Sequence, residues 1–402
     1  EQERFEREGQ TWLDRVQVIQ QHDRLGTGHA ARIGLAGFSD LDQARLLIVY
    51  GDTPLVRPET LHSLAKANET ITVLGFKTDP PHQYARLIID DQGQLERIIE
   101  ACDLDASQQQ LRLCNAGLMG ADLAAFKTLQ AHIPQSQGGE YYLTELPYLA
   151  GQHALSCGYR TGRLDELQGV NDLAQLSAAE QSWQRSARHD LMRSGVIMHA
   201  PDTVILHYDT VIEPGAMLEA NLVFGPGVVI HAHAQIRAFS HLEGAIVHEH
   251  ARIGPFARLR PGTIIGEKAR IGNFVEIKNS KIGCGTTADH LTYLGDSWLE
   301  DRVKIGAGTI SCNYDGIAKW QTRIGQGSFV GSNSTLVAPL SIGEDCLIAA
   351  GSIVVEDSPD SHLVIARTRQ QNKPGGMEAR RTQFRQRAQA STAGSKPGKA
   401  KA

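Results

Sequence analysis

Along residues 204–354 an aliphatic or aromatic residue recurs at every sixth position in three phased blocks, commonly followed by a small residue or glycine. A six-residue period fits neither an α-helix nor a hairpin, but it is typical of a β-solenoid in which each hexad forms one short strand and one corner. Three hexads make one coil, and the recurring side chains point inward and stack from coil to coil. We therefore predict a left-handed parallel β-helix of hexapeptide repeats over residues 196–367. The recurring positions are Ile212, Leu218, Phe224, Ile230, Ile236, Leu242, Ile253, Leu259, Ile265, Ile271, Ile277, Ile324, Val330, Leu336, Ile342, Ile348 and Val354.

The first part of the chain has another pattern, in which short apolar runs alternate with helical stretches. This alternation is typical of an α/β domain, and we assign residues 1–172 to a Rossmann-like domain of that class. Asp52 follows one apolar run and should lie at the carboxyl end of a strand, where open α/β sheets bind ligands. It is a candidate metal ligand. The runs lie at residues 46–50, 71–76, 87–89 and 113–118.

The two patterned regions are joined by a predicted helix, and a tail follows them. Apolar residues spaced three or four apart from Leu176 to Leu191 predict a connecting helix over residues 173–195, which Gly195 ends. Residues 368–402 are polar, basic and rich in Gly, Ala, Ser and Lys. This composition predicts a disordered tail.

Composition narrows the class of protein. With 41% hydrophobic and 21% charged residues, the 402-residue chain resembles soluble globular proteins. The formal net charge of -5 gives no general attraction to nucleic acid. No run approaches the roughly 18 apolar residues of a membrane span, and the first residues lack the apolar core of a signal peptide. Six cysteines without paired spacing indicate reduced, mostly buried thiols and a cytoplasmic protein.

The candidate chemistry lies in and beside a segment, residues 282–324, that departs from the hexads and carries many polar side chains. Insertions in solenoids become loops, often on the binding face, so we expect His290 and Tyr293 in such a loop. Arg260 and Lys278 are 18 residues apart, one full coil, and should stack as a clamp for phosphate. His290 is the candidate general base for an attacking amine, and Glu276 could orient it.

Two other functions are compatible with the hexads. The pairs His231 with His233 and His248 with His250 could bind zinc, as in a metal-dependent hydratase of this fold. No acidic or cysteine partner is registered with these histidines in the sequence. The second alternative is a non-catalytic trimeric scaffold, which would keep the hexads and tolerate loss of His290.

Several motifs resemble one family of bacterial enzymes. FARLRPG, IGNFVEIK, DHLTYLGD, KIGAGTISCNYDG, FVGSNSTLVAP and IAAGS resemble, in this order, the acetyltransferase half of the bifunctional enzymes that make UDP-N-acetylglucosamine. QQHDRLGTGHA, VYGDTPL, NAGLMG, GEYYLTEL and LQGVND resemble the uridylyltransferase half. The resemblance spans nearly the whole chain to Arg367, and it implies a homotrimer.

For the β-helix the resemblance implies acetyl transfer from acetyl-coenzyme A to glucosamine 1-phosphate. His290 would be the general base, and an amine that has lost its proton would attack the thioester. The implied sugar-phosphate residues are Arg260, Lys278, Tyr293 and Asn313. The implied acetyl-coenzyme A residues are Ala307, Asn313, Tyr314, Ser332, Ala350 and Arg367.

For the first domain the resemblance implies transfer of a uridylyl group from UTP to N-acetylglucosamine 1-phosphate. Asp52 and Asn171 would hold Mg²⁺, a cation that prefers oxygen ligands. The implied substrate residues are Gln21, Gly26, Thr27, Tyr50, Gly51, Asp52, Ala85, Glu100, Asn115 and Asn171.

The chain departs from the family pattern at three places. The family begins with a glycine-rich loop whose backbone amides hold the nucleotide phosphates, and this sequence begins after it. We therefore expect an incomplete uridylyl site and weak or absent uridylyl transfer. Ala85 replaces a glycine near the sugar, and Lys304 replaces an asparagine near the acetyl-coenzyme A site.

Overall fold

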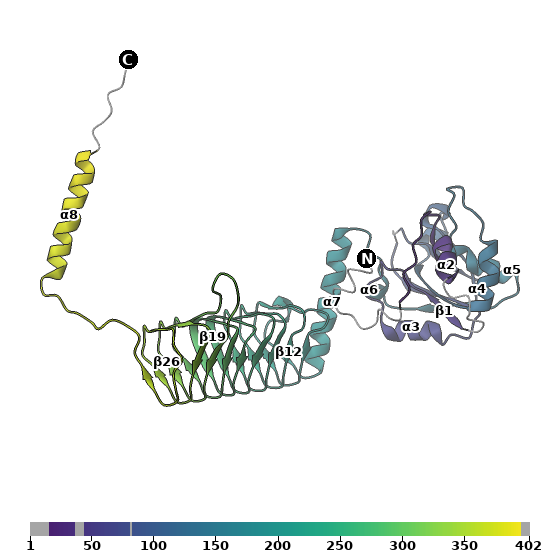
Figure 1. Ribbon diagram of the computed structural model, residues 1–402. Helices are drawn as coiled ribbons and strands as arrows, with labels where there is room; N and C mark the ends of the chain where they lie inside the picture. Colours follow the sequence, from purple (N-terminus) through teal and green to yellow (C-terminus); the bar gives the residue numbers. More distant parts are fainter. Residues whose placement is uncertain (1–15, 37–43, 81–82, 395–402) are drawn as a thin grey trace, which may run out of the picture. The chain divides into compact units, whose positions relative to one another are not determined.

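The computed structural model describes residues 16–36, 44–80 and 83–394. The chain divides into two compact units, residues 1–186 and 187–402, and each is described by itself (Figure 1). Among the described residues, no helix combines the length and the apolar character that crossing a bilayer requires.

The first unit contains a six-stranded mixed sheet in the order β4-β3-β5-β2-β6, with β1 also paired to β5. Only β2 and β6 are parallel to each other, and the other pairs are antiparallel. The four predicted strands are confirmed. The strands are β1 (Arg45–Ile48), β2 (Ile71–Lys77), β3 (Arg86–Ile89), β4 (Leu95–Ile99), β5 (Leu113–Asp122) and β6 (Cys157–Thr161).

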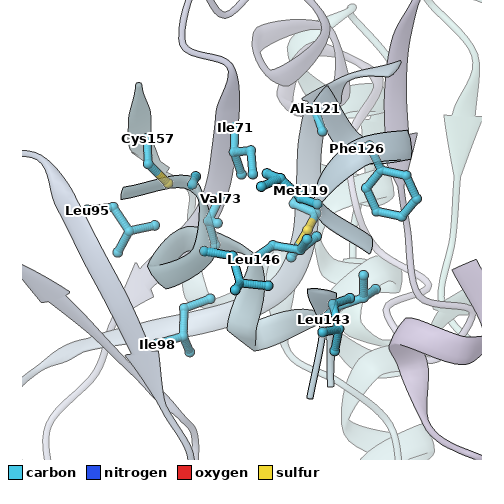
Figure 2. Close-up of a cluster of buried hydrophobic side chains, with 14 of the residues drawn as sticks. Ile71, Val73, Leu95, Ile98, Met119, Ala121, Phe126, Leu143, Leu146 and Cys157 are labelled. Atoms are coloured by element: carbon cyan, nitrogen blue, oxygen red, sulfur yellow. The ribbon is translucent and has the colours of Figure 1, made fainter. Parts of the chain in front are cut away.

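Apolar side chains cover both faces of this sheet, because successive residues of a strand point to opposite sides. On β2, Ile71 and Val73 belong to one buried cluster, and Leu74 and Phe76 belong to another. Figure 2 shows the first cluster, in which Leu146 of a covering helix lies over the strands. The helices of this unit are α2 (Thr27–Ala36), α3 (Pro58–Ala65), α4 (Leu123–Leu129), α5 (Leu146–Gln152) and α6 (Leu164–Leu167).

Helix α7 (Leu173–Arg193) confirms the helix predicted between the two patterned regions. Arg188 on its second half is buried and donates hydrogen bonds to the carbonyl oxygen of Val204, at 3.1 Å, and to the carboxylate of Asp202, at 3.2 Å. These bonds attach the end of the helix to the first coil of the β-helix.

The second unit is a left-handed parallel β-helix, as the hexads predict (Figure 1). Every strand pair in it is parallel, and its strands form one sheet of 17 strands and one of eight. The larger sheet contains β7 (Ile197–Met198), β8 (Val204–Ile205), β10 (Met217–Leu218), β11 (Leu222–Phe224), β13 (Gln235–Ile236), β14 (His241–Leu242), β16 (Arg252–Ile253), β17 (Arg258–Leu259), β19 (Arg270–Lys278), β21 (Thr287–Gly295), β23 (Lys304–Ile305), β24 (Ile310–Cys312), β26 (Phe329–Val330), β27 (Thr335–Val337), β29 (Leu347–Ile348), β30 (Ile353–Val354) and β31 (Leu363–Val364). The smaller sheet contains β9 (Val211–Ile212), β12 (Val229–Ile230), β15 (Ala245–Val247), β18 (Thr263–Ile265), β20 (Lys281–Ile282), β22 (Ser297–Leu299), β25 (Thr322–Ile324) and β28 (Leu340–Ile342).

All the predicted inward positions are at most 5% exposed, which confirms the hexad register. The predicted interruption over residues 282–324 is wrong for most of its length. Ala288, Leu294, Leu299 and Ile305 continue the buried column, in register with the coils before and after. The small side chain of Ala288 and a 17-residue coil concealed the repeat from a search for large aliphatic residues at intervals of six. Only residues 313–321 leave the coil.

The tail and the cysteines differ in part from expectation. Residues 376–394 form helix α8 (Gly376–Gly394) where composition predicted disorder. Ala, Arg and Gln have high helix propensity, and no Gly or Pro interrupts residues 377–393. No disulfide occurs in the described residues. Three of the six thiols are buried, rather than most of them.

Candidate functional sites

A cavity of about 1110 Å³ in the first unit brings together most of the residues expected to bind a nucleotide sugar. They come from α2, from the turn after β1, from the ends of β4 and β5, and from the segment after α6. Ala85, one of the departures from the family pattern named above, is part of the wall. The predicted residues that line the cavity are Thr27, Tyr50, Asp52, Ala85, Glu100, Asn115 and Asn171.

The remaining three predicted residues of this site do not line the cavity. Gly26 has a φ of +91°, and a side chain there would meet the carbonyl oxygen of Tyr141 at 2.7 Å, so glycine is required by space and by backbone. Gln21 has its side-chain amide 3.0 Å from Nδ1 of His29. Gly51 lies in the turn before Asp52.

The two predicted magnesium ligands lie on neighbouring segments. The backbone N–H of Val170 donates to the carbonyl oxygen of Asp52 at 2.8 Å, and Gly169 packs beside the Asp52 carboxylate. Asn171, the next residue, lines the same cavity. One carboxylate and one amide oxygen fit a Mg²⁺ ion that takes its other ligands from phosphate and water.

Tyr50 is held at the wall of this cavity by Gly117. A side chain at Gly117, where φ is +79°, would lie 2.5 Å from the Tyr50 ring. Burial raises the pKa of the Tyr50 hydroxyl. A hydrogen bond with Thr27 lowers this pKa and the nearby charges of Glu100 and Asp52 raise it, so that the net pKa is above the usual value. The hydroxyl is therefore protonated at neutral pH and can donate to a ligand.

In the second unit, His290 lies on strand β21 rather than in a loop, which corrects the expectation. Its Nδ1 is 2.8 Å from Oδ1 of Asn273, 17 residues earlier and one coil below. Because an amide oxygen only accepts hydrogen bonds, this contact places the proton on Nδ1 and leaves Nε2 as the basic nitrogen. Glu276, which we expected to orient His290, instead pairs with Arg260 at 3.0 Å.

Three of the predicted acetyl-coenzyme A residues continue the column that His290 begins along one corner of the β-helix. The carbonyl oxygen of His290 accepts from Gly308 N–H at 3.4 Å, and that of Ala307 accepts from Asn333 N–H at 2.8 Å. The carbonyl oxygen of Ser332 accepts from Gly351 N–H at 2.8 Å. His290, Ala307 and Ser332 therefore occupy equivalent positions on successive coils, and Ala350 directly precedes Gly351. The side chains of this column beyond His290 are therefore all small.

The predicted sugar-phosphate residues lie close together on adjacent coils of the β-helix. Lys278 pairs with Asp296 at 3.6 Å, and Asn313 also donates to that carboxylate. Tyr293 places its hydroxyl over Gly295, where a Cβ would be 2.3 Å away. The register of β17 with β19 puts Arg260 opposite Lys278, as the 18-residue spacing predicts.

Asp296 is the centre of this group, and the sequence did not single it out. Burial acts to raise the pKa of its carboxyl, but hydrogen bonds from Asn279 and Asn313 and the charge of Lys278 outweigh burial. The net pKa is below the usual value. Its position directly after the DHLTYLG run was the available signal.

Asp315 organises the one segment that leaves the coils, residues 313–321. Its carboxylate accepts from the N–H groups of Ile317 and Ala318 and from Nε1 of Trp320 at 2.6–2.8 Å. These bonds lower the pKa of Asp315 to about 2. Tyr314, predicted to contact acetyl-coenzyme A, is exposed on this loop and donates its hydroxyl to Gly316.

Arg367 and Lys304 have no side-chain hydrogen bond or ion pair within the described residues. Arg367 is exposed in the segment after β31. Lys304 is exposed on β23, one coil after Thr287.

The four histidines considered as zinc ligands stack as two pairs across adjacent coils. The rings of His231 and His248 are 5.0 Å apart and nearly parallel, and those of His233 and His250 are 5.2 Å apart. Nδ1 of His231 lies 3.1 Å from the carboxylate of Glu213. No group of three or more His, Cys, Asp or Glu suited to a metal occurs in the described ranges.

Comparisons with known proteins identify relatives of this chain. A family model described as bacterial transferase hexapeptide (six repeats) matches residues 244–279, and one described as hexapeptide repeat of succinyl-transferase matches residues 321–356. The chain is 41% identical over 364 residues to a protein of Jannaschia sp. (strain CCS1) named bifunctional protein GlmU, covering 89% of this chain and 79% of that one. Proteins of the same name from Rhizobium rhizogenes and Agrobacterium fabrum are 45% and 43% identical. They cover 90% and 93% of this chain, which spans 80% and 82% of their lengths.

Proposed function

The chain belongs to the bifunctional GlmU family, and from this premise we propose that its β-helix transfers the acetyl group of acetyl-coenzyme A to the amine of glucosamine 1-phosphate. The observation that carries the proposal is the corner of the β-helix at His290. There a basic imidazole nitrogen is followed along the corner by the small side chains of Ala307, Ser332 and Ala350, beside which we expect the thioester to bind.

The residues of this corner account for the chemistry. His290 Nε2 takes the proton that the amine loses as its nitrogen bonds to the thioester carbon. The carbon–sulfur bond then breaks, His290 gives this proton to the departing sulfur, and coenzyme A leaves as a thiol. The Asn273 hydrogen bond keeps the imidazole in the tautomer that can accept this proton.

A site built by several copies of the chain, as a homotrimer, is part of the proposal. Four residues lie between His290 and Gly295, the register partner of Lys278, and the chain turns a corner between them at Leu291, whose φ is +49°. The cavity that contains His290 is lined by none of the four sugar-phosphate residues. A neighbouring copy packed on this face would bring the base and the phosphate clamp of different copies together.

We also propose uridylyl transfer from UTP to N-acetylglucosamine 1-phosphate in the cavity of the first unit, giving UDP-N-acetylglucosamine and pyrophosphate. Asp52 and Asn171 would hold Mg²⁺, which would neutralise phosphate charge during attack on the α-phosphorus. The gathering of the seven predicted residues around one cavity supports this assignment. The product is a precursor of peptidoglycan and lipopolysaccharide, so we place the reactions in the cytoplasm.

A paired assay tests both activities on the full chain. Release of free thiol from acetyl-coenzyme A with glucosamine 1-phosphate measures the first reaction, and release of pyrophosphate from UTP with N-acetylglucosamine 1-phosphate measures the second. His290→Ala should lower the acetyl-transfer rate by about 10²- to 10⁴-fold, the usual contribution of a general base, and should leave uridylyl transfer unchanged. Acetyl transfer at the full rate in this variant would refute the mechanism.

Light scattering tests the assembly. We expect a mass three times that of one chain. If the chain is a monomer and still transfers acetyl groups, the shared site is wrong.

A further inference from the structure

A cavity of about 320 Å³ contains His290 and three arginines that the proposed mechanism does not use. Arg237, Arg252 and Arg270 come from three successive coils, and Asn273 and Asp289 complete the polar part of the wall. Asn273, whose side chain holds the catalytic tautomer of His290, therefore also lines a cavity with three arginines.

The β-helix register forces these positive charges together. Arg252 and Arg270 are Cα partners on adjacent parallel strands, which lie about 4.8 Å apart. Arg237 lies on the coil before, two residues after the register partner of Arg252. Like charges on neighbouring strands repel, so this arrangement is unfavourable without an anion.

The protein itself supplies only one opposite charge. Arg270 pairs with Asp289 at 3.0 Å. The side chains of Arg237 and Arg252 have no hydrogen bond or ion pair with any part of the chain that the structure describes. Three guanidinium groups against one carboxylate leave an excess of two positive charges, which matches a phosphate near pH 7.

The predicted phosphate clamp differs in this respect. Arg260 is paired with Glu276 at 3.0 Å and Lys278 with Asp296 at 3.6 Å, so both cations already have a carboxylate partner. Arg237 and Arg252 are the cations beside His290 whose donors are available, and a guanidinium binds phosphate with two parallel hydrogen bonds.

We propose that this cavity binds a phosphate group of a substrate of the acetyl transfer, in contact with Arg237, Arg252 and Arg270, and so positions that substrate beside His290. The proposal rests on the acetyltransferase function and adds to it a second anion site, apart from Arg260 and Lys278. Both substrates carry phosphate, so the ligand chemistry is the same for coenzyme A and for the sugar phosphate.

The surroundings give the bound molecule an apolar neighbour as well. Phe256 and Phe274 directly follow cavity residues, and their exposed rings are 5.2 Å apart between centroids. The Phe256 ring also stacks on that of Phe239, at 4.9 Å. A ligand that carries a base or an alkyl chain besides its phosphate can cover part of this surface.

Calorimetric titration of the full chain tests the site without requiring turnover. The probes are coenzyme A, coenzyme A without its 3′-phosphate, glucosamine 1-phosphate and pyrophosphate. Arg252→Gln should weaken at least one of the first three by about tenfold, as expected for a lost charge-assisted contact, and should weaken pyrophosphate too. Arg237→Gln should do the same.

Arg302→Gln is the matched control, since Arg302 is an exposed arginine at another corner, with no side-chain hydrogen bond or ion pair to described residues. If Arg252→Gln weakens coenzyme A more than coenzyme A without its 3′-phosphate, the ligand is coenzyme A. If, of the two substrates, the substitution weakens only glucosamine 1-phosphate, the ligand is the sugar phosphate. Thermal unfolding of Arg252→Gln should not be lowered, because the substitution removes a like charge.

If each of the four probes binds the wild type, Arg252→Gln and Arg237→Gln with the same affinity, the proposal is overturned. Its failure is distinct from failure of the acetyltransferase function, which would appear as a wild-type chain that releases no thiol.

Discussion

The hydrogen bond between Asn273 and His290 offers the sharpest test of the acetyl-transfer site. Asn273→Ala removes the acceptor 2.8 Å from Nδ1 and leaves the backbone register of β19 and β21 intact. A hydrogen bond of this kind contributes about 1–1.5 kcal/mol. If that energy holds the reactive tautomer and ring orientation, kcat should fall about five- to tenfold. The effect is smaller than for His290→Ala, because the base itself remains.

The assay is thiol release at saturating substrates, with kcat and KM measured separately across pH. Asn273→Asp keeps an acceptor and should restore the rate at high pH. Its carboxylate stabilises the protonated imidazole, so the acidic limb of the rate profile should move to higher pH. Gln235→Ala, which removes a side-chain amide of the same β-helix outside the cavity, is the control. An unchanged kcat in Asn273→Ala, or an Asn273→Asp profile without this movement, would refute the reasoning.

Three further predictions concern other parts of the chain. Gly117→Ala should lower pyrophosphate release and spare thiol release, because the new methyl would lie 2.5 Å from the Tyr50 ring at a φ of +79°. Asp296→Asn should lower the free energy of unfolding by about 1–3 kcal/mol at pH 7 in urea titrations, since one of the two oxygens that accept from Asn279 and Asn313 becomes an amide nitrogen that cannot accept, and the charge opposite Lys278 is lost. Because the folded pKa of Asp296 is below the usual 3.8, its contribution is present above that pH and lost as pH falls through the folded value, so the difference should shrink only below about pH 4. In mass spectrometry, a maleimide at pH 7 should label exposed Cys102 and spare Cys157, whose pKa burial raises to about 12; equal labelling would contradict that burial.

Much of the β-helix was predictable because its repeat is local. Each hexad repeats the same strand and corner, so a buried residue such as Ile253 or Leu336 can be recognised from its neighbours in the sequence. The same search failed at Ala288 because alanine also occurs at many outward positions and so does not mark an inward position in the sequence. In the first unit, the strands were predictable from apolar runs. The antiparallel pairing of β1 with β5 was not, because that contact joins residues far apart in the chain.

For function, the sequence by itself determined which residue types recur and which side chains share a face, including the stacking of Arg260 opposite Lys278. Only the tertiary structure decided what each side chain contacts. It assigned Asn273 rather than Glu276 to His290, and it placed Arg237 in the same cavity as His290. The physical reason is coil length: a change from 18 to 17 residues moves every later side chain by one position against the coil below. Hydrogen-bond partners across coils therefore depend on the folded register.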